Sequence, residues 1–144
     1  MWIPDVNVLV AAYRTDHDHH EVARTWLQSA MAAVEPVGLT ESVLSAVVRI
    51  VTDPRIFRVP TAPEQAFVEL DRLLERSHLV RPGRTWWSIF RNLCVEASAR
   101  GALVADAAHA ATAIEAGATW VTFDRDFARF PRLRWQTPTK ETDG

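Results

Sequence analysis

The stretch ATWVTFDRDF, residues 118–127, decides how this chain is expected to fold. Its first six residues are mostly apolar, aromatic or β-branched, a pattern that is typical of a short strand buried on both faces. Two acids, Asp124 and Asp126, follow this strand. Asp124 could cap a following helical turn, because its side-chain oxygen can accept hydrogen bonds from the free N–H groups there. Whether it does more depends on how the other strands end.

Short apolar runs and helical periodicity alternate along the rest of the chain. The other expected strands are residues 2–3, 36–39, 78–80, 103–104 and 133–135. The expected helices are residues 6–13, 20–34, 40–52, 61–74, 84–99 and 106–116. Residues 61–64, TAPE, have the form of a capping box with proline in the first turn. Gly101 is expected to close the fifth helix, because glycine readily adopts the left-handed conformation found at many helix ends.

This alternation predicts an α/β fold with a short central parallel β-sheet flanked by α-helices. The chain has 144 residues, which is the size of one domain. We expect that domain to cover residues 1–137 and a polar C-terminal tail to cover residues 138–144. Ligands bind beyond the carboxyl ends of the strands in such sheets, so the residues that follow each strand are the candidates for a site.

The composition predicts a protein of the cytoplasm. Cys94 is the one cysteine, so it cannot form an internal disulfide, and its apolar neighbours predict a small buried side chain rather than a nucleophile. No apolar run approaches the roughly 18 residues that suggest a membrane span, and the N-terminus lacks the pattern of a signal peptide. The net charge of −2 does not by itself indicate a nucleic-acid partner.

Four acids occupy the same kind of position, where an expected strand ends and a helical segment begins. They are Asp5, Glu41, Asp106 and Asp124. Each alone could be a helix cap, but four carboxylates gathered at one sheet edge would repel each other unless a cation lay among them. A site rich in carboxylate oxygens suits Mg²⁺ or Mn²⁺, and such an ion can assist the hydrolysis of a phosphodiester.

Polar neighbours of these acids could support the same site. Asn7 and Thr122 each lie two residues from an acid and could orient a carboxylate or serve as local hydrogen bonders. Arg49 lies two helical turns after Glu41 and could pair with an acid or contact a phosphate. Further arginines that could hold a phosphate or simply face solvent follow the last acid: Arg125, Arg129, Arg132 and Arg134.

Histidines offer two alternatives. The run of residues 17–20, HDHH, could bind zinc, but it lacks a second, separated ligand pair, so a solvated loop is the favoured interpretation. His109 lies one helical turn after Asp106 and could contact a substrate or a metal-bound water, or it could be a partly exposed helical histidine.

Other enzyme classes fit the sequence poorly. Receiver domains and phosphatases of the haloacid dehalogenase type also place an aspartate after the first strand, but both use a lysine, and Lys140 in the tail is the one lysine of this chain. No nucleophile elbow and no glycine-rich phosphate loop is present.

Four segments in this order resemble one family. They are PDVNVLVAAY (residues 4–13), LTESVLSAVVRIVTDPRIF (39–57), ADAAHAATAIEAGATWVTFDRDFARFP (105–131) and LRW (133–135). Together they are similar to the PIN-domain ribonucleases, specifically the VapC-type toxins of type II toxin–antitoxin systems. The resemblance covers nearly the whole chain.

The resemblance implies a PIN-like fold and a Mg²⁺-dependent endoribonuclease that cleaves structured RNA such as tRNA or rRNA. Mn²⁺ would substitute for Mg²⁺. By this similarity the metal-binding, catalytic quartet is Asp5, Glu41, Asp106 and Asp124, with Asp126 as a helper. A homodimer held inactive by a cognate VapB-type antitoxin is also implied. The alternatives are a catalytically silent PIN-like RNA-binding or regulatory module and a housekeeping RNA-processing enzyme.

Two sequence features affect these expectations. Pro4, directly before Asp5, removes a backbone donor and so could disturb the first strand and the acid that follows it. Trp86 and Trp87 cannot both face inward on one helix, so the exposed one, with Phe90, marks a candidate surface for a second copy or an antitoxin. The helix over residues 43–51 is an equally reasonable antitoxin seat.

Overall fold

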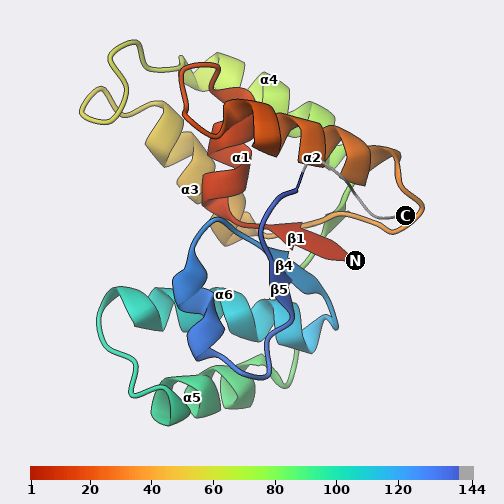
Figure 1. Ribbon diagram of the computed structural model, residues 1–144, viewed down its shortest axis with the longest axis vertical. Coiled ribbons are helices and arrows are strands. Elements are labelled where there is room, and N and C mark those ends of the chain that lie inside the picture. Colours follow the sequence, from red (N-terminus) through yellow and green to blue (C-terminus); the bar gives the residue numbers. More distant parts are fainter. Residues whose placement is uncertain (140–144) are drawn as a thin grey trace.

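Five short parallel strands form the centre of the protein. The computed structural model describes residues 1–139 (Figure 1), and residues 140–144 of the expected tail lie outside this range. The strands are β1 (Trp2–Pro4), β2 (Gly38–Leu39), β3 (His78–Leu79), β4 (Thr119–Val121) and β5 (Trp135–Gln136). β4 pairs with both β1 and β5, β2 pairs with β3, and a single bridge between Trp2 and Val37 joins the two sheets.

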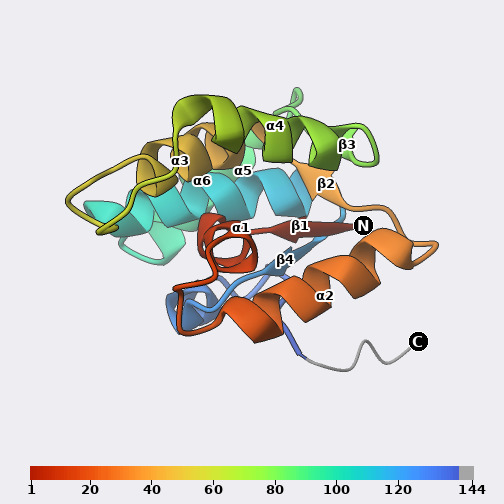
Figure 2. The same ribbon diagram turned by 90° about the horizontal axis from the view of Figure 1, so that it is seen from above.

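Helices cover both faces of the strands, so the expected α/β fold is confirmed. They are α1 (Val6–Tyr13), α2 (His20–Ala32), α3 (Glu41–Val51), α4 (Pro63–Leu74), α5 (Trp86–Glu96) and α6 (Ala102–Glu115), and a 3₁₀ helix, η1, spans Arg125–Arg129. Figure 2 shows α2 on one side of β1 and β4, and α4 and α6 on the other. None of the helices within residues 1–139 is long and apolar enough to cross a membrane.

Tryptophans join the helices to the sheet. Trp120 on β4 is fully buried and its ring stacks on His109 of α6, while Trp26 of α2 meets Trp2 of β1 edge-on. The expectation that Trp26 and Trp120 lie in the core is confirmed. Burial of such large apolar surfaces is the main favourable contribution to folding, so these contacts hold α2 and α6 in place beside the strand ends.

The start of α6 differs from the prediction. Residues 103–104 belong to the first turn of α6 and do not form a strand. Gly101, with φ of +57°, precedes this helix instead of closing α5, whose end is followed by Ser98 with φ of +48°. Glycine adopts a positive φ without steric strain, so the chain can turn at Gly101 and α6 can start directly after it. Asp106 therefore lies inside α6, one turn beyond its start.

The predicted capping box at residues 61–64 is also wrong. The residue before α4 is Ala62, and no side chain caps this helix. Thr61 instead donates its backbone N–H to Val51 and accepts a hydrogen bond from Arg14 through its hydroxyl. Thr61 thus bonds Arg14 and Val51, which are distant in the sequence, and does not cap α4.

Pro4 does not disturb the pairing of β1. Backbone donors alternate along the strand: Trp2 donates to Pro36 on one side, and Asp5 donates to Val121 of β4 on the other. The missing N–H of Pro4 would point to the side of Pro36, where Trp2 already forms the bridge to Val37. The bond that fixes Asp5 is therefore retained.

We predict that Gly38→Ala destabilises the protein. A Cβ at this position would lie 2.8 Å from Val80 Cγ2, 2.9 Å from Met1 Sδ and 3.2 Å from Ile3 Cγ1. Overpacking of this kind costs about 1–3 kcal/mol, which urea unfolding would measure. The comparison is Gly83→Ala, where the new methyl group would meet only the exposed carboxylate end of Glu115, which can shift at the expense of its hydrogen bonds to Gly83 and Thr85. Equal losses of stability in the two variants would contradict the prediction.

Candidate metal and nucleic-acid site

Asp5 is a buried acid at the end of β1, with 8% of its surface exposed. Its backbone N–H donates to Val121 on β4 at 2.8 Å, which ties it to the neighbouring strand. Its Oδ1 accepts from the N–H of Val6 at 2.6 Å, so the same side chain caps α1. The second oxygen, Oδ2, points to the end of β4.

Thr122, which follows β4, connects Asp5 to the rest of the site. Its hydroxyl donates to Asp5 Oδ2 at 2.6 Å and accepts from the backbone N–H of Asp124 at 3.0 Å. Asn7 Nδ2 lies 3.2 Å from the same hydroxyl, and Asn7 Oδ1 accepts from the N–H of Phe123. Asn7 and Thr122 thus fix the ends of β1 and β4 against each other and orient the Asp5 carboxylate.

Asp124 caps η1, as the sequence predicted. Its Oδ1 accepts from the backbone N–H of Asp126 at 2.9 Å. Asp124 is half-buried, and Asp126 is exposed. The cap uses one carboxylate oxygen of Asp124, so the second oxygen is not needed to hold η1.

Asp106 of α6 completes a group of neighbouring acids. Burial raises the pKa of its carboxyl group, and the negative charges of Asp124 and Asp5 raise it further, while His109 opposes the shift. Burial also raises the pKa of Asp5; hydrogen bonds from Thr122 and Val6 counteract this, and the charge of Asp124 adds to it. The structure therefore brings Asp5, Asp106 and Asp124 within electrostatic range of one another.

Glu41 stands apart from these three acids. It begins α3 after β2, as expected, but its carboxylate is 67% exposed and accepts a hydrogen bond from Arg81 Nε at 3.1 Å. Within residues 1–139, Glu41 is not among the charges that shift the pKa of Asp5 or Asp106. Arg81 was missed in the sequence, although it follows β3 just as the acids follow their strands.

Comparisons with known proteins establish the family of this chain. The PIN domain model matches residues 3–133. The chain belongs to the PIN-domain family. It is 45% identical to ribonuclease VapC43 of Mycobacterium tuberculosis over 136 residues, which cover 93% of this chain and 92% of that protein. It is 37% identical to ribonuclease VapC25 of the same species over 140 residues, covering 96% of this chain and 99% of the relative.

Solved structures share the fold at lower identity. VapBC2 from Rickettsia felis, bound to a DNA fragment from its promoter, matches with a TM-score of 0.72 and 20% identity, over 94% of this chain and 97% of that chain. FitAcB from Neisseria gonorrhoeae matches with a TM-score of 0.67 and 20% identity, over 96% and 98% of the two chains. These matches place the chain in the PIN fold.

The acids of this PIN domain have the chemistry of a hard-cation site but are not gathered tightly. Within the described range, no three histidine, cysteine, aspartate or glutamate side chains are close enough to hold a metal ion. Three carboxylates whose charges oppose one another nevertheless suit a divalent cation with oxygen ligands. For one ion to bind all three, side-chain movements would have to bring the oxygens of Asp5, Asp106 and Asp124 together.

Within residues 1–139, the histidines are not gathered into a cluster that could hold zinc. His20 Nδ1 lies 2.8 Å from the carbonyl oxygen of Ala11, which fixes the start of α2 against α1. His19 is exposed and stacks on Phe123, with 4.6 Å between ring centroids. His109 stacks on Trp120, and burial lowers its pKa although Asp106 acts in the opposite direction. Burial therefore favours the neutral form of the His109 imidazole beside Asp106.

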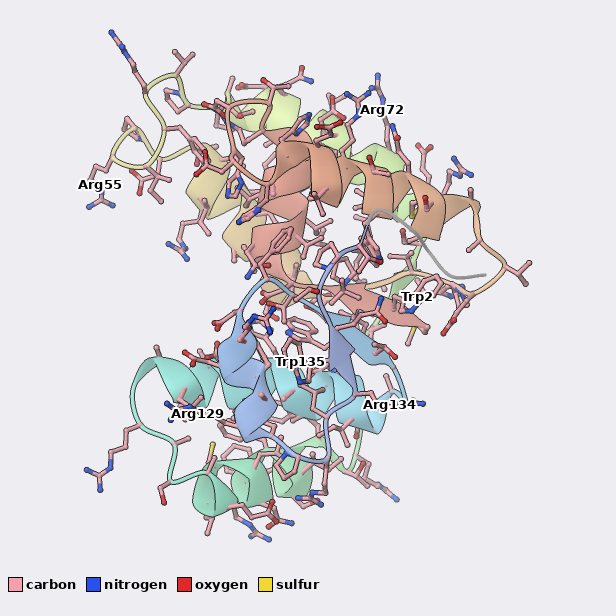
Figure 3. The ribbon with its side chains drawn as sticks, in the orientation of Figure 1. Trp2, Arg55, Arg72, Arg129, Arg134 and Trp135 are labelled. Atoms are coloured by element: carbon pink, nitrogen blue, oxygen red, sulfur yellow. The ribbon has the colours of Figure 1, made fainter. Side chains whose placement is uncertain are left out.

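The arginines after the last acid divide into two pairs. Arg132 bonds Glu96 of α5, and Arg134 donates to the carbonyl of Gly117, so both have structural partners. Arg125 and Arg129 on η1 are exposed. Figure 3 shows Arg129 and Arg134 well apart, so the four residues do not make one cluster.

We predict that Thr122→Val destabilises the PIN domain by about 1–3 kcal/mol, because it leaves the buried Asp5 oxygen and the Asp124 N–H without their hydroxyl partner. Urea unfolding is the measurement. Thr119→Val, which makes the same change at a partly exposed threonine of β4, is the control. If both variants were equally stable, the hydroxyl would not be holding the site together.

We also predict that Asp106→Asn stabilises the metal-free protein. The folded-state pKa of Asp106 is raised, so the ionised carboxylate costs stability once the pH passes that pKa. Removing the charge should raise the midpoint of thermal unfolding at pH 7 by about 2 °C. The gain should shrink as the pH falls through the raised pKa of Asp106 and vanish below about pH 4, where the carboxyl group is protonated in both the folded and the unfolded parent protein. A lower midpoint at pH 7 would show that the three acids do not repel one another.

Proposed function

We propose that this PIN domain is a divalent-metal-dependent endoribonuclease and the toxin of a toxin–antitoxin pair. The observation that carries the proposal is the convergence of Asp5, Asp106 and Asp124 at the carboxyl ends of β1 and β4, with burial and mutual repulsion raising the pKa of two of them. Such an arrangement destabilises the isolated protein and favours a bound cation. The names of the relatives, all VapC ribonucleases, support the same activity.

The metal ligands would be Asp5, Asp106 and Asp124, with Glu41 as the fourth after release from Arg81. Mg²⁺ is the expected ion, and Mn²⁺ would substitute. When bound, the ion would stabilise the negative charge that builds up on a phosphodiester during hydrolysis. The protein's own contribution is to hold the Asp5 carboxylate in one orientation through Thr122 and Asn7.

Other residues of the chain would act on the RNA. Asp126 lies beside Asp124 and would help to orient water at the site. Arg125, exposed on η1, and Arg49, exposed on the last turn of α3, would contact phosphates. The substrate would be a structured RNA such as a tRNA or rRNA, in which a loop can present a single strand.

The antitoxin and a second copy of the chain would need separate surfaces. A hollow of about 390 Å³ between α1, α2, α3 and α4 is lined in part by Val47, Val51 and Leu70, and we propose it as the seat of a VapB-type antitoxin. Trp87, which is 64% exposed on α5, is the candidate centre of a homodimer contact. The nuclease unit would be residues 1–137.

A catalytically silent RNA-binding module is the second candidate. It is favoured by the Glu41–Arg81 ion pair and by the open spacing of the acids within the described residues.

An RNA cleavage assay distinguishes the endoribonuclease from the silent RNA-binding module. We predict that the purified chain cuts total RNA at discrete sites with Mg²⁺ or Mn²⁺, and that EDTA abolishes the cuts. Asp124→Asn should reduce the rate by on the order of a hundredfold or more yet fold normally, because asparagine can also cap η1. The matched control is Asp71→Asn, which changes an exposed aspartate on α4. Full activity of the Asp124→Asn variant would exclude the site, and no cleavage by the folded parent would favour the silent module.

A further inference from the structure

A second hollow opens directly beside Asp5. Its volume is about 360 Å³, within the range of roughly 300–1,000 Å³ that is usual for small-molecule sites. Asp5 and Asn7 form one end. Most of the remaining wall is apolar or aromatic, and the side chains that supply it are Val6, Val10, His17, Ile50, Ile56 and Phe57. We call this hollow the Asp5 recess.

Arg14 fixes the two loops that surround the Asp5 recess. Its guanidinium group bonds both carboxylate oxygens of Asp16, at 2.9 and 2.6 Å, and donates to the Thr61 hydroxyl at 3.1 Å. The same group lies 4.1 Å above the centre of the Phe57 ring. Residues 14–16 and residues 57–61 are thereby joined, so the recess is formed before any ligand binds.

His17 supplies a directed hydrogen-bond donor to this apolar wall. Its Nδ1 accepts from the backbone N–H of His19 at 3.0 Å. In the neutral imidazole the proton therefore lies on Nε2, which can donate to a ligand. His17 also neighbours the His19 ring, at 5.9 Å between centroids, and His19 stacks on Phe123 next to Asp124. Aromatic rings thus run from the recess to the acids.

We propose that the Asp5 recess holds one unpaired nucleobase of the RNA, next to the phosphate that is cleaved. Aromatic and apolar walls accept the flat face of any base, while the Nε2–H of His17 selects bases with an acceptor on the facing edge. Two exposed arginines adjoin lining residues of the recess in the sequence, Arg49 and Arg58, and favour a polyanionic ligand over an apolar peptide segment. Arg55 is paired with Asp53 at 3.2 Å and lies at the outer edge of its loop (Figure 3). This inference rests on the proposed nuclease function.

Nucleotide binding tests the recess without requiring cleavage. The probes are AMP, GMP, CMP and UMP, added separately to the metal-free chain while NMR follows the methyl group of Ile50 and the ring of His17. We expect saturable shifts at both residues for at least one nucleotide. Ile56→Trp, which would fill the recess from an exposed position, should weaken binding about tenfold. Val68→Trp, an exposed apolar residue on α4, is the control and should bind as the parent does.

Cleavage mapping then tests the role of His17. His17→Phe keeps an aromatic ring but removes the donor, so the base preference at one position beside the cut should relax. The KM of this variant should rise about tenfold with little change in kcat, because the lost hydrogen bond would stabilise the bound substrate and the transition state equally.

The outcomes separate this inference from the nuclease proposal. Nucleotide shifts at the recess in a chain that cuts no RNA would contradict the nuclease alone. RNA cleavage without such shifts, or with an unchanged cleavage pattern and KM in the Ile56→Trp variant, would overturn the recess. Loss of binding to a partner protein in that variant, with normal RNA cleavage, would identify the recess as a protein-docking surface and also overturn the inference.

Discussion

The parallel pairing of β1 with β4 is the constraint on which the rest of the site depends. It aligns Pro4 with Val121, so that the first residues beyond the two strands, Asp5 and Thr122, lie side by side. A 2.6 Å hydrogen bond between their side chains then joins segments that are 117 residues apart in the sequence. α6, held against β4 by the stack of His109 on Trp120, brings Asp106 to the same edge.

The acids at this edge of the sheet destabilise the folded protein, because burial and neighbouring negative charges disfavour their ionised forms. Burial of Asp5 disfavours its ionised form, and the hydrogen bonds that its carboxyl group accepts offset only part of this penalty, since its pKa remains raised. A protein selected for stability alone would place neutral caps at these positions. A site whose charges are balanced only by its ligands is a common feature of functional centres, and here the ligands we propose are a divalent cation and RNA.

The sequence predicted the layers of the fold well because short buried strands and amphipathic helices leave strong periodic patterns. The expected positions of Asp5 and Asp124 at strand ends are also close to those observed: Asp5 directly follows β1, and Asp124 lies three residues after the last residue of β4. The start of α6 was not predictable from two apolar residues, 103 and 104, whose pattern suits either a strand or a helix. Long-range partners could not be predicted, because neither the Glu41–Arg81 pair nor the Arg14–Thr61 bond leaves a local signal in the sequence. The second of these takes the place of the helix cap expected of Thr61.

The most direct test of the account is the position of a bound metal ion. Crystals grown with Mn²⁺ and measured at its absorption edge would reveal the ion by anomalous scattering. The account predicts a peak among the carboxylates of Asp5, Asp106 and Asp124. A peak at the histidine run of residues 17–20 alone, or no peak near these three acids at saturating Mn²⁺, would contradict it.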